Sequence, residues 1–531
     1  MKNKSITKHP APSKFASSYC CPICEENIFV YQFTIHNVQV VRCQSCGLLS
    51  NSSSPDGNGF LTTRDGDGDV LNPEIIWTDS ETEQDAAISY VELLKTKGLK
   101  TASRILLVAP PDHTFASEAS RVGWQISQFE SVTSLEAATI GIEFDAAVIL
   151  YKLEKSTDPI GLAKIVHSAL KPRGVLMIVT PSLDSTSAKF FGSSWTEWRP
   201  ENLFYFNKTN IQLFLWRTGF NKLVIQKDRR KYTLSHIHNR AKAFPKTWIT
   251  RSIKAAYHIV PAPLRYLRLR LPSSGMIITA VREDLHEPQV CSIIIPAYNE
   301  SETFPILMDA IIAKKLPGGM DKEIIIIESN SKDGTREQVL KYQDSLGIKI
   351  ILQDKARGKG NAVREGFANA TGDILYIQDA DLEYDLNDLD ALLKPIVKYQ
   401  APFVLGSRHG GKWKMREFDG EEGLSIFFNF GHLLFTTLLN TLYGQNMKDP
   451  FTMYKIFRRD CIYGLNFESN RFDLDFELII KLVRKGYTPV EIPVNYRSRS
   501  YKEGKKVRVF RDPLTWIRAL VKYRFAKITK E

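Results

Sequence analysis

Two separate series of apolar runs, each alternating with stretches of helical periodicity, constrain the fold of this chain more than any other feature. In the first series we expect strands at 104–110, 145–151, 174–181 and 275–281 and helices at 85–94 and 159–170. In the second we expect strands at 291–295, 323–327, 348–352, 373–378 and 402–406 and helices at 302–315, 334–345 and 360–370. Buried strands that alternate with helices predict βαβ units around a parallel sheet. The chain is therefore expected to be an α/β protein with two such domains.

The length of the chain agrees with several domains, because 531 residues exceed the roughly 100–200 residues of an ordinary domain. The predicted organisation is a flexible tail at 1–18, a cysteine unit at 19–50, a linker and leading helix at 51–84, and α/β domains at 85–283 and 290–531. A basic segment, 227–272, is mostly helical in pattern and is expected as an insertion in the first α/β domain.

Four of the seven cysteines form two Cys-x-x-Cys pairs, Cys21 with Cys24 and Cys43 with Cys46, separated by eighteen residues. This spacing allows four thiolates to surround one Zn²⁺ in a tetrahedron, and a unit this short needs the metal to fold. Four thiolates leave no open coordination position, so the zinc is expected to be structural. A pair of disulfides, or chance spacing, is the alternative interpretation.

Positive charge is concentrated in two segments. Residues 227–270 include twelve Lys and Arg and one acidic residue, and residues 484–531 include fourteen Lys and Arg and four acidic residues. Such segments are either solvated faces or surfaces that attract phosphate, as lipid headgroups, lipid-linked phosphates or nucleotides. No nucleic-acid-binding module is recognisable, so no nucleic-acid partner is expected.

The expected location follows from apolar content and cysteine usage. The N-terminal residues lack the apolar core of a secretory signal, and unpaired cysteines suit a reducing cytosol. The longest uncharged stretch, 424–447, is too polar for a membrane span of about 20 apolar residues. Its helix at 424–442 fits either buried core or a lipid-facing interfacial helix. We expect a cytoplasmic protein, peripheral on the cytoplasmic face of a membrane.

Polar motifs follow successive strands of the second α/β series, where an open sheet binds its ligands. The first strand ends in SIIIPAYNE (292–300), whose Pro296, Tyr298 and Glu300 lie where a base or ribose could be held. Lys359 opens a helix within RGKGN (357–361), and a helix N-terminus favours anions. Arg408 follows the fifth strand and could clamp a phosphate, or could be an ordinary surface arginine.

Asp379-Ala380-Asp381 directly follows a buried strand. Two carboxylates at this spacing on an irregular turn can share one Mg²⁺ or Mn²⁺, cations that prefer oxygen ligands and bridge diphosphate oxygens. A lone Asp-x-Asp is common in surface turns, but its place after a buried strand favours a metal and diphosphate site. Glu383 is a nearby third candidate.

The order of these motifs resembles glycosyltransferase family 2, of the type that includes dolichol-phosphate mannose synthases and other polyprenyl-phosphate hexosyltransferases. DPFT (449–452), FDLDFE (472–477) and the basic loop after Tyr496 resemble the later motifs of those enzymes. The resemblance implies a GT-A fold at 290–531 and inverting transfer of a hexose from a nucleotide-sugar. It also implies donor contacts from Glu328, Ser329, Arg497 and Lys505, with Ser329 replacing an acid of the family pattern.

The acceptor decides whether a base is required. A polyprenyl phosphate is already ionised at neutral pH, so positioning and charge neutralisation suffice. A saccharide hydroxyl needs a carboxylate base, for which Asp475 and Glu477 are the candidates. The resemblance favours the lipid phosphate; surface-polysaccharide synthesis on a hydroxyl is the alternative.

The first half resembles class I methyltransferases that carry an N-terminal zinc ribbon, through FDAAVILYKLEK (144–155), LKPRGVLMIVTPSLDS (170–185) and FFGSSWTEWRPENLFYF (190–206). The resemblance implies a Rossmann-like fold and a Gly-rich turn for S-adenosylmethionine after the first strand. Here that turn reads VAPPDHTF (108–115), without glycine. We therefore expect a domain that has lost methyl transfer. A second active enzyme, or a docking protein that retains both folds, are the alternatives.

Overall fold

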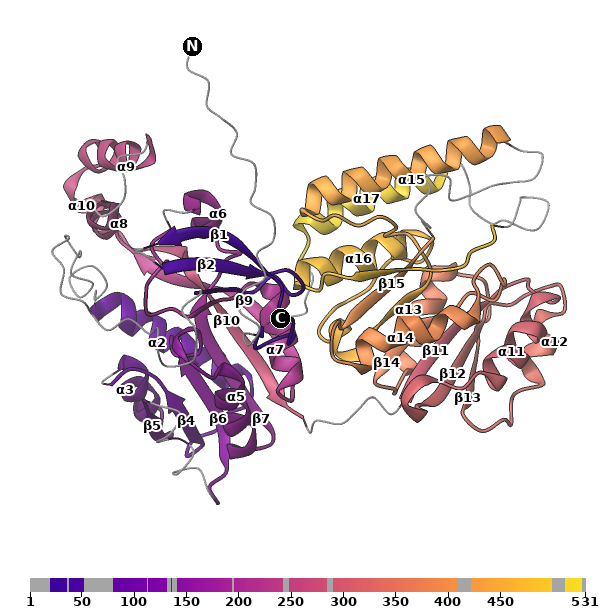
Figure 1. Cartoon of the computed structure of the whole chain (residues 1–531), viewed down its shortest axis with the longest axis horizontal. Helices are drawn as coiled ribbons and strands as arrows, with labels where there is room; N and C mark the ends of the chain where they lie inside the picture. The colour runs from indigo at the N-terminus through magenta and orange to yellow at the C-terminus, as the bar shows by residue number, and fades with distance from the viewer. Residues whose placement is uncertain are drawn as a thin grey trace, which may run out of the picture. The chain divides into compact units, whose positions relative to one another are not determined.

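The structure is a computed structural model that describes residues 20–35, 38–51, 80–111, 113–130, 135, 141–192, 195–241, 248–283, 290–408, 422–498 and 511–527. The chain forms two compact units, residues 1–285 and 286–531, called here the N-terminal and C-terminal units. Three sheets with connecting helices confirm the predicted α/β class (Figure 1). The predicted tail at 1–18 and residues 52–79 of the predicted linker lie outside the described residues.

The cysteine unit belongs to a small antiparallel sheet in the N-terminal unit. The strand order is β1 (Phe29–Ile35), β2 (Val38–Cys43), β3 (Leu49–Asn51) and β8 (Phe204–Tyr205). Because β8 comes from the following α/β domain, the cysteine unit is joined to that domain by a shared sheet. Trp198 reinforces the junction, with its ring centroid 4.9 Å from that of Phe33 in an edge-on contact.

A six-stranded sheet forms the rest of the N-terminal unit. Its order is β5 (Gln125–Phe129), β4 (Arg104–Val108), β6 (Phe144–Leu150), β7 (Leu170–Pro181), β10 (Leu269–Arg282) and β9 (Phe220–Tyr232). The first four strands are parallel, and β10 is antiparallel to both neighbours. Its helices are α2 (Ser80–Thr96), α3 (Thr114–Arg121), α5 (Pro159–Ala169), α6 (Thr186–Phe191) and α7 (Lys208–Arg217). All four predicted strands are present; β5 and β9 were not predicted.

The basic segment at 227–272 differs from the sequence-based expectation of a helical insertion. Its ends are strand, because β9 continues to Tyr232 and β10 begins at Leu269, and the two pair as an antiparallel ribbon. Only the middle is helical, as α8 (Leu234–Ala241), α9 (Trp248–Ile259) and α10 (Ala262–Arg265). The continuous run of charged residues at 227–231 hid the strand pattern, because it lacks the apolar–polar alternation typical of a strand.

The C-terminal unit is built on a seven-stranded sheet. Its order is β13 (Ile348–Leu352), β12 (Asp321–Glu328), β11 (Val290–Ala297), β14 (Ile374–Ile377), β16 (Lys455–Arg458), β15 (Phe403–Ser407) and β17 (Val490–Pro493). The first four strands are parallel, whereas β16 is antiparallel to both β14 and β15. The five predicted strands are confirmed; β16 and β17, of four residues each, were missed.

The helices of the C-terminal unit are α11 (Thr303–Ala313), α12 (Thr335–Leu340), α13 (Lys359–Asn369), α14 (Leu389–Val397), α15 (Glu422–Tyr443), α16 (Asp473–Lys485) and α17 (Arg511–Phe525). The long helix α15 lies beside α17 (Figure 1). Phe435 of α15 and Phe476 of α16 both pack against the ring of Trp516 in α17. Among the described residues, no helix combines the length and apolarity needed to cross a bilayer.

The centre of this sheet explains why its strands were predictable. Residues 293–295 of β11 and 324–327 of β12 are all isoleucine and all buried. Strands of a parallel sheet covered on both faces read as continuous apolar runs. Each isoleucine buried in this way contributes about 1.5–3 kcal/mol to the hydrophobic stabilisation. The sheet is therefore a rigid support for the turns at its carboxyl edge.

Candidate active site

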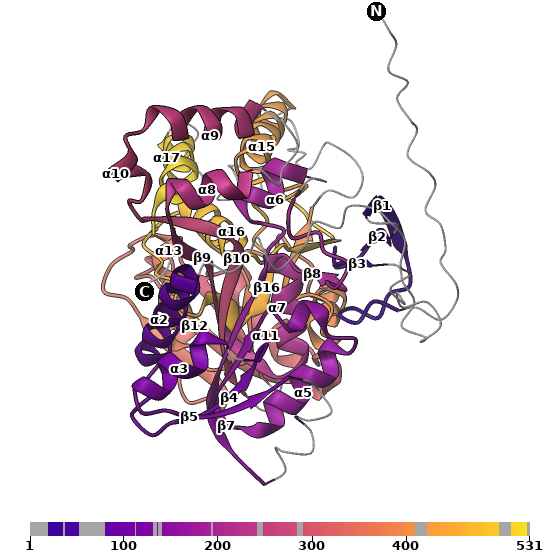
Figure 2. The same ribbon diagram turned by 90° about the vertical axis from the view of Figure 1, so that its left-hand side faces the viewer.

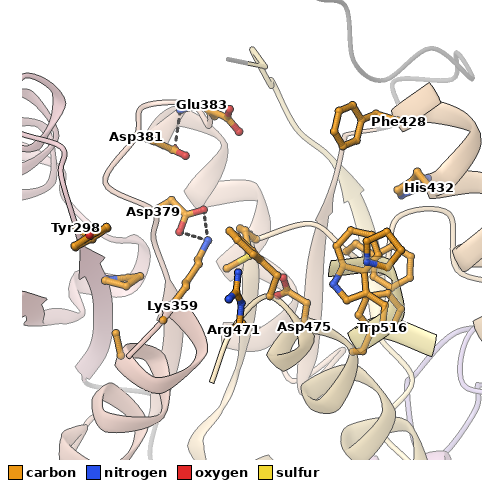
Figure 3. A pocket seen from close by; sticks show the side chains of 18 of the residues that line it. Tyr298, Lys359, Asp379, Asp381, Glu383, Phe428, His432, Arg471, Asp475 and Trp516 are labelled. Carbon is orange, nitrogen blue, oxygen red and sulfur yellow. Dashed lines mark hydrogen bonds and ion pairs between the residues drawn. The ribbon is translucent and has the colours of Figure 1, made fainter. Parts of the chain in front are cut away.

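A cavity of about 930 Å³ opens where β11, β12 and β14 end and continues between α15 and α17. One half is lined by charged and polar side chains and by the turns that carry them: Pro296, Tyr298, Glu300, Ser329, Arg357, Lys359, Asp379, Asp381, Glu383, Arg408, Arg471, Asp475 and Tyr496. The other half is apolar: Phe427, Phe428, Phe430, Leu434, Phe435, Phe451, Phe476, Pro513, Trp516 and Ile517. Figure 3 shows both halves, with Asp379 and Asp381 in one and Phe428 and Trp516 in the other.

The turn after β11 is held by the turn after β12. The backbone N–H of Glu300 donates to Thr335 Oγ1 at 2.8 Å, and that of Ser301 donates to Asp333 Oδ2 at 3.0 Å. Burial alone would raise the pKa of Asp333, but the hydrogen bonds from Thr335 and Ser301 lower it to about 2. Asp333 is thus a fixed anion that braces Pro296, Tyr298 and Glu300 at the cavity.

Glu328 and Ser329 were both predicted to contact the donor, and only Ser329 lines the cavity. Glu328 is fully buried, accepts the backbone N–H of Ser331 at 2.6 Å and forms an ion pair with Arg336. Ser329 is also nearly buried and donates its hydroxyl to Gln353 Oε1 at 2.9 Å. In this structure Glu328 therefore shapes the turn rather than facing a ligand.

Lys359 points from the first turn of α13 to Asp379. Its Nζ lies 2.5 Å from Oδ1 and 2.6 Å from Oδ2 of that carboxylate (Figure 3). Desolvation opposes the charge on Lys359, but Asp379, Asp475 and Asp381 raise the pKa of the ammonium group. Lys359 is therefore a firmly charged cation at the polar end of the cavity.

Close packing against a neighbouring backbone, rather than approach to a phosphate, explains the two glycines beside Lys359. A Cβ on Gly358 would lie 2.4 Å from the carbonyl oxygen of Asn470, and one on Gly360 would lie 2.6 Å from that of Arg471. Gly358 also has a φ of +100°, which favours glycine. Both glycines make room for the backbone at 470–471, and this contact positions the N-terminus of α13.

Asp381 lies on the same turn as Asp379, one residue before Leu382, which has a φ of +57°. Its Oδ1 accepts the backbone N–H of Glu383 at 3.2 Å, and Thr303 Oγ1 fixes the turn by donating to the carbonyl of Ala380 at 2.6 Å. Glu383 accepts a hydrogen bond from the hydroxyl of Tyr496 at 2.8 Å. The structure thus brings Asp379, Ala380 and Asp381 to the cavity together.

These residues fit a hard divalent cation. Mg²⁺ is typically held by one or two carboxylates together with waters and substrate phosphates, rather than by an all-protein cage. Asp379 and Asp381 supply two such carboxylates from one braced turn that lines the cavity. A third protein ligand is not needed, because the phosphates of a nucleotide would complete the coordination.

Arg408 lines the cavity, but its guanidinium already has a partner. Nε and Nη2 bind Asp449 Oδ2 and Oδ1 at 2.8 and 2.7 Å, and the same carboxylate is 3.0 Å from His432 Nε2. Burial opposes the charge on Asp449, but Arg408 and His432 hold its pKa well below the usual range. Asp449 therefore orients Arg408 toward the cavity through a bidentate pair.

Asp475 and Glu477, both predicted as candidate bases, have different surroundings. Asp475 lines the cavity, and its Oδ1 accepts from the buried Nζ of Lys455 at 2.8 Å. Burial lowers the pKa of Lys455, although Asp475 acts in the opposite direction. Glu477 is fully buried away from the cavity lining, where it pairs with Lys481 and accepts the backbone N–H of Ser469 at 2.7 Å. Glu477 thus stabilises the loop before α16.

The basic loop after Tyr496 is only partly described. Arg497 is exposed and outside the cavity lining, and its backbone N–H donates to the carbonyl of Glu383 at 2.9 Å. Lys505 lies outside the described residues, so its predicted contact with the donor stays a prediction.

Three groups at the site were not singled out from sequence. Lys455 could have been noticed in the sequence, because a lysine in a short apolar strand is rarely buried unless it has a charged partner. Asp449 was part of the DPFT motif but was given no role. His432 gave no local signal, since its partner Asp449 is 17 residues further along, in the loop before β16, and only the folded chain brings the two together.

The four cysteines of the N-terminal unit form a second candidate site. Their Sγ atoms all lie within 4.8 Å of one another, and the cross-pairs Cys21–Cys46 and Cys24–Cys43 are 3.5 and 3.4 Å apart. A disulfide would require about 2.05 Å. Thiolates around zinc at about 2.3 Å lie roughly 3.8 Å apart in a tetrahedron. The arrangement therefore fits a closed metal site and does not fit disulfides.

The turn after β4, where the methyltransferase resemblance implies a cofactor, faces a buried cluster of side chains. Arg230 Nε lies 2.9 Å from Asp228 Oδ2, and Arg230 also donates to the hydroxyls of Tyr90 and Tyr151. Tyr151 directly follows β6. His113 lies beside the turn, and burial together with the charge of Arg230 lowers its pKa to about 4. These residues do not fit S-adenosylmethionine, since a sulfonium cation would meet a guanidinium and a proline-rich turn without glycine.

Comparison with known proteins places both units. Residues 292–464 match the model of glycosyl transferase family 2, and residues 77–225 match a methyltransferase domain model. A dolichol-phosphate mannosyltransferase of Pyrococcus furiosus is 27% identical over 216 residues, covering 40% of this chain and 58% of that protein. A dolichyl-phosphate beta-glucosyltransferase of Dictyostelium discoideum is 29% identical over 250 residues, covering 44% of this chain and 73% of that protein.

Among solved structures, glucosyl-3-phosphoglycerate synthase of Mycobacterium tuberculosis has 17% identity and a TM-score of 0.34, and the match covers 45% of this chain and 81% of that one.

Proposed function

The C-terminal unit belongs to glycosyltransferase family 2, and from this premise we propose that it transfers a hexose from a nucleotide-sugar to a polyprenyl phosphate. One observation carries the proposal: a single cavity has Asp379, Asp381 and Lys359 in its polar half and apolar side chains of α15 and α17 in its other half, called here the apolar corridor. The first half suits a nucleoside diphosphate, and the second suits a hydrocarbon chain. The similarity to dolichyl-phosphate glycosyltransferases supports the same acceptor class.

The donor is proposed to lie along the carboxyl edge of the sheet. Pro296, Tyr298, Glu300 and Ser329 hold its base and ribose, as ligands of open α/β sheets bind at this edge. Asp379 and Asp381 hold Mg²⁺ or Mn²⁺, which would offset the charge of the diphosphate.

The reaction is a direct displacement with inversion. An oxygen of the acceptor phosphate attacks the anomeric carbon, the bond from that carbon to the diphosphate oxygen breaks, and the nucleoside diphosphate leaves with the bonding electrons. The acceptor is already ionised, so no proton has to be removed. Lys359 stands beside Asp379 and can stabilise negative charge on the leaving group. Arg408, oriented by Asp449, can meet the acceptor phosphate.

The apolar corridor is proposed to hold the first isoprene units. Phe428, Phe435 and Trp516 line it, and several large apolar side chains of the same two helices are exposed outside it: Ile426, Leu433, Leu438 and Val521. An amphipathic pair of this kind can lie in the headgroup region of a bilayer. We accordingly propose peripheral attachment, on the cytoplasmic face of a membrane.

A saccharide hydroxyl acceptor is the second candidate, and the position of Asp475 favours it. This carboxylate lines the cavity and could remove the hydroxyl proton. Glu477, buried in its pair with Lys481, has no corresponding role in the proposal. Arg497 and Lys505 remain proposed donor-phosphate contacts, carried by the family pattern alone.

The N-terminal unit contains a methyltransferase domain, and we propose that it neither binds S-adenosylmethionine nor transfers methyl groups. The buried cluster of Arg230 with Asp228, Tyr90 and Tyr151, and the proline-rich turn without glycine after β4, support this. The cysteine cluster is proposed to hold one structural Zn²⁺. Calorimetry of the full chain with S-adenosylmethionine tests the first part: no heat of binding is expected, and saturable binding would contradict it.

The transferase proposal is tested with labelled GDP- and UDP-hexoses, Mn²⁺ or Mg²⁺, and a set of acceptors. We expect a lipid-extractable product with polyprenyl phosphate, in which the anomeric configuration is inverted. Product on free saccharides or alkyl glycosides, with none on polyprenyl phosphate, would replace this function with the second candidate.

A further inference from the structure

The segment between β9 and β10 is the most one-sidedly charged part of the N-terminal unit. From Arg229 to Arg282 it contains twelve Lys and Arg and no Asp or Glu. It comprises the end of β9, helices α8, α9 and α10, and the start of β10. In Figures 1 and 2 the three helices lie together beyond the end of the six-stranded sheet. Neither the glycosyl transfer nor a metal site accounts for this segment.

Stacked rings join the helices α8 and α9. His238 of α8 stacks on Tyr257 of α9 with ring centroids 4.1 Å apart and planes 13° apart. The guanidinium of Arg265 lies 4.6 Å from the centroid of the same tyrosine, and its Nε donates to the carbonyl of Val260 at 2.8 Å. These contacts fix Tyr257 between α8 and the side chain of Arg265.

Four large apolar side chains at the end of the helical segment are exposed. Ile259 is 80% exposed, Leu264 55%, Tyr266 66% and Leu267 56%, and all four lie within nine residues at the end of α9, in α10 and in the following turn. Single exposed apolar residues are ordinary, but a contiguous group on a projecting element marks an interaction surface. We call residues 259–267 the insertion tip.

Acidic side chains of α2 neutralise the base of the segment, whereas the segment itself contains no Asp or Glu. Helix α2 supplies the acids at the base, where Asp85 pairs with Arg268 at 2.7 Å and with Lys231 at 2.8 Å, and Glu81 pairs with Arg268. Arg251 and Lys254 of α9 and Arg270 of β10 are exposed. The tip thus combines apolar side chains with a cationic border.

We propose that the insertion tip docks onto an anionic phospholipid bilayer. Ile259, Leu264, Tyr266 and Leu267 enter the boundary between headgroups and acyl chains, and Arg251, Lys254 and Arg270 meet the lipid phosphates. This combination of apolar side chains bordered by Lys and Arg is what interfacial elements use. A surface for single-stranded nucleic acid would call for aromatic stacking platforms, whereas three of the four tip residues are aliphatic. The proposal goes beyond sugar transfer and does not depend on it.

The test uses the full chain in a flotation assay, with vesicles of phosphatidylcholine alone or with added phosphatidylglycerol. One variant carries Leu264→Ser and Leu267→Ser, and a second carries Arg251→Glu and Lys254→Glu. We expect each to lower partition onto anionic vesicles by about tenfold or more. Leu346→Ser and Lys164→Glu, at exposed positions elsewhere, are the matched controls and should bind as the unchanged chain does.

Other outcomes would overturn the proposal. They are unchanged partition of both tip variants, equal binding of the unchanged chain to neutral vesicles, or a self-association in solution that the tip variants abolish. Loss of binding only with Leu433→Ser and Leu438→Ser would assign attachment to α15 instead. Should a double variant lose its folded circular dichroism, the single changes Tyr266→Ser and Leu267→Ser decide the question by the same assay.

Discussion

Asp381 lines the cavity, and we propose that its carboxylate helps to hold a metal ion. Lys359 faces both oxygens of Asp379, and Asp381 Oδ1 accepts the backbone N–H of Glu383. Asp449 has the opposite role, because its carboxylate is fully engaged by Arg408 and His432. The same residue type is therefore proposed to bind a metal ion in one place and orients a guanidinium group in another.

Asp381→Asn is predicted to lower kcat for sugar transfer by about 100-fold or more, because an amide cannot balance the charge of a cation and diphosphate. Steady-state rates check the loss, and calorimetry with the nucleoside diphosphate and Mn²⁺ should show weaker binding. Asp390→Asn is the matched control, since Asp390 pairs with Lys314 on the surface at 2.8 Å. Equal activity of Asp381→Asn and Asp390→Asn would remove Asp381 from the site.

Glu154 gives the N-terminal unit a predictable pH dependence. Burial raises the pKa of this carboxyl to about 7, despite a hydrogen bond from Thr180 Oγ1 at 2.9 Å. The native state therefore keeps the proton between about pH 4.5 and 7 while the unfolded chain releases it. The free energy of unfolding falls as pH rises through this window, by about 3 kcal/mol in total.

Glu154→Gln should remove this dependence. The variant should therefore gain stability relative to the unchanged chain as the pH rises from about 5 to about 7. Urea unfolding of the full chain, followed by the fluorescence transition of the N-terminal unit, measures the difference. Glu201→Gln, at a neighbouring exposed residue, is the control. A constant difference between Glu154→Gln and the unchanged chain across this window would contradict the shifted pKa.

At the scale of elements, the N-terminus of α13 depends on how closely the 470–471 backbone approaches it. Gly358→Ala adds a Cβ that would lie 2.4 Å from the carbonyl oxygen of Asn470, at a φ of +100°. Gly334→Ala meets a similar φ, +95°, with nothing within 4 Å of its Cβ. The pair therefore separates steric conflict from backbone strain.

Gly358→Ala is predicted to cost more stability than Gly334→Ala, which should cost about 1–2 kcal/mol for the left-handed φ alone. It should also raise the KM for the donor, because Lys359 is displaced from Asp379. Thermal unfolding and donor kinetics measure the two effects. Equal stability and equal donor KM in both variants would show that the approach of 470–471 does not position α13.

The elements that could be predicted from the sequence are those whose local residue pattern shows directly which faces are buried. The isoleucine runs of β11 and β12 are buried on both faces, so their apolarity is continuous and locally visible. Strands β16 and β17 have four residues each, and β16 begins with Lys455 and ends with Arg458, so that only two apolar residues remain between them. The base of the 227–272 segment was missed because a cationic ribbon lacks the alternation that identifies a strand.

The candidate site divides in the same way. Asp379, Asp381, Tyr298 and Lys359 were predictable, because each follows or precedes an element at the carboxyl edge of a parallel sheet. The roles of Glu328 and Glu477 were not, since their partners Arg336 and Lys481 bury them only in the folded chain. Likewise, the reason for Gly358 lies in a backbone contact more than a hundred residues along the chain (Asn470).

At the scale of the whole molecule, the cysteine cluster and the cavity belong to different units. Cys24→Ser, or treatment with a strong chelator, is predicted to remove about one zinc per chain. It should lower the stability of the N-terminal unit while glycosyl transfer continues. Metal analysis and transfer rates on the same preparation measure both. Cys20→Ser, at an exposed cysteine outside the cluster, should change neither.

A zinc content that Cys24→Ser does not reduce would contradict the metal site. Glycosyl transfer that is lost together with the zinc, in a chain whose C-terminal unit stays folded, would contradict the separation of the two functions.

The central claim is that one cavity holds a nucleotide-sugar in its polar half and a polyprenyl chain in its apolar half. It is tested most directly by the kinetics of Leu434→Asp, on the apolar side, with short- and long-chain polyprenyl phosphates. We predict that the KM for the long-chain acceptor rises at least about tenfold, with the KM for the donor unchanged. An unchanged preference for the long chain, or equal loss of donor and acceptor binding, would contradict the account.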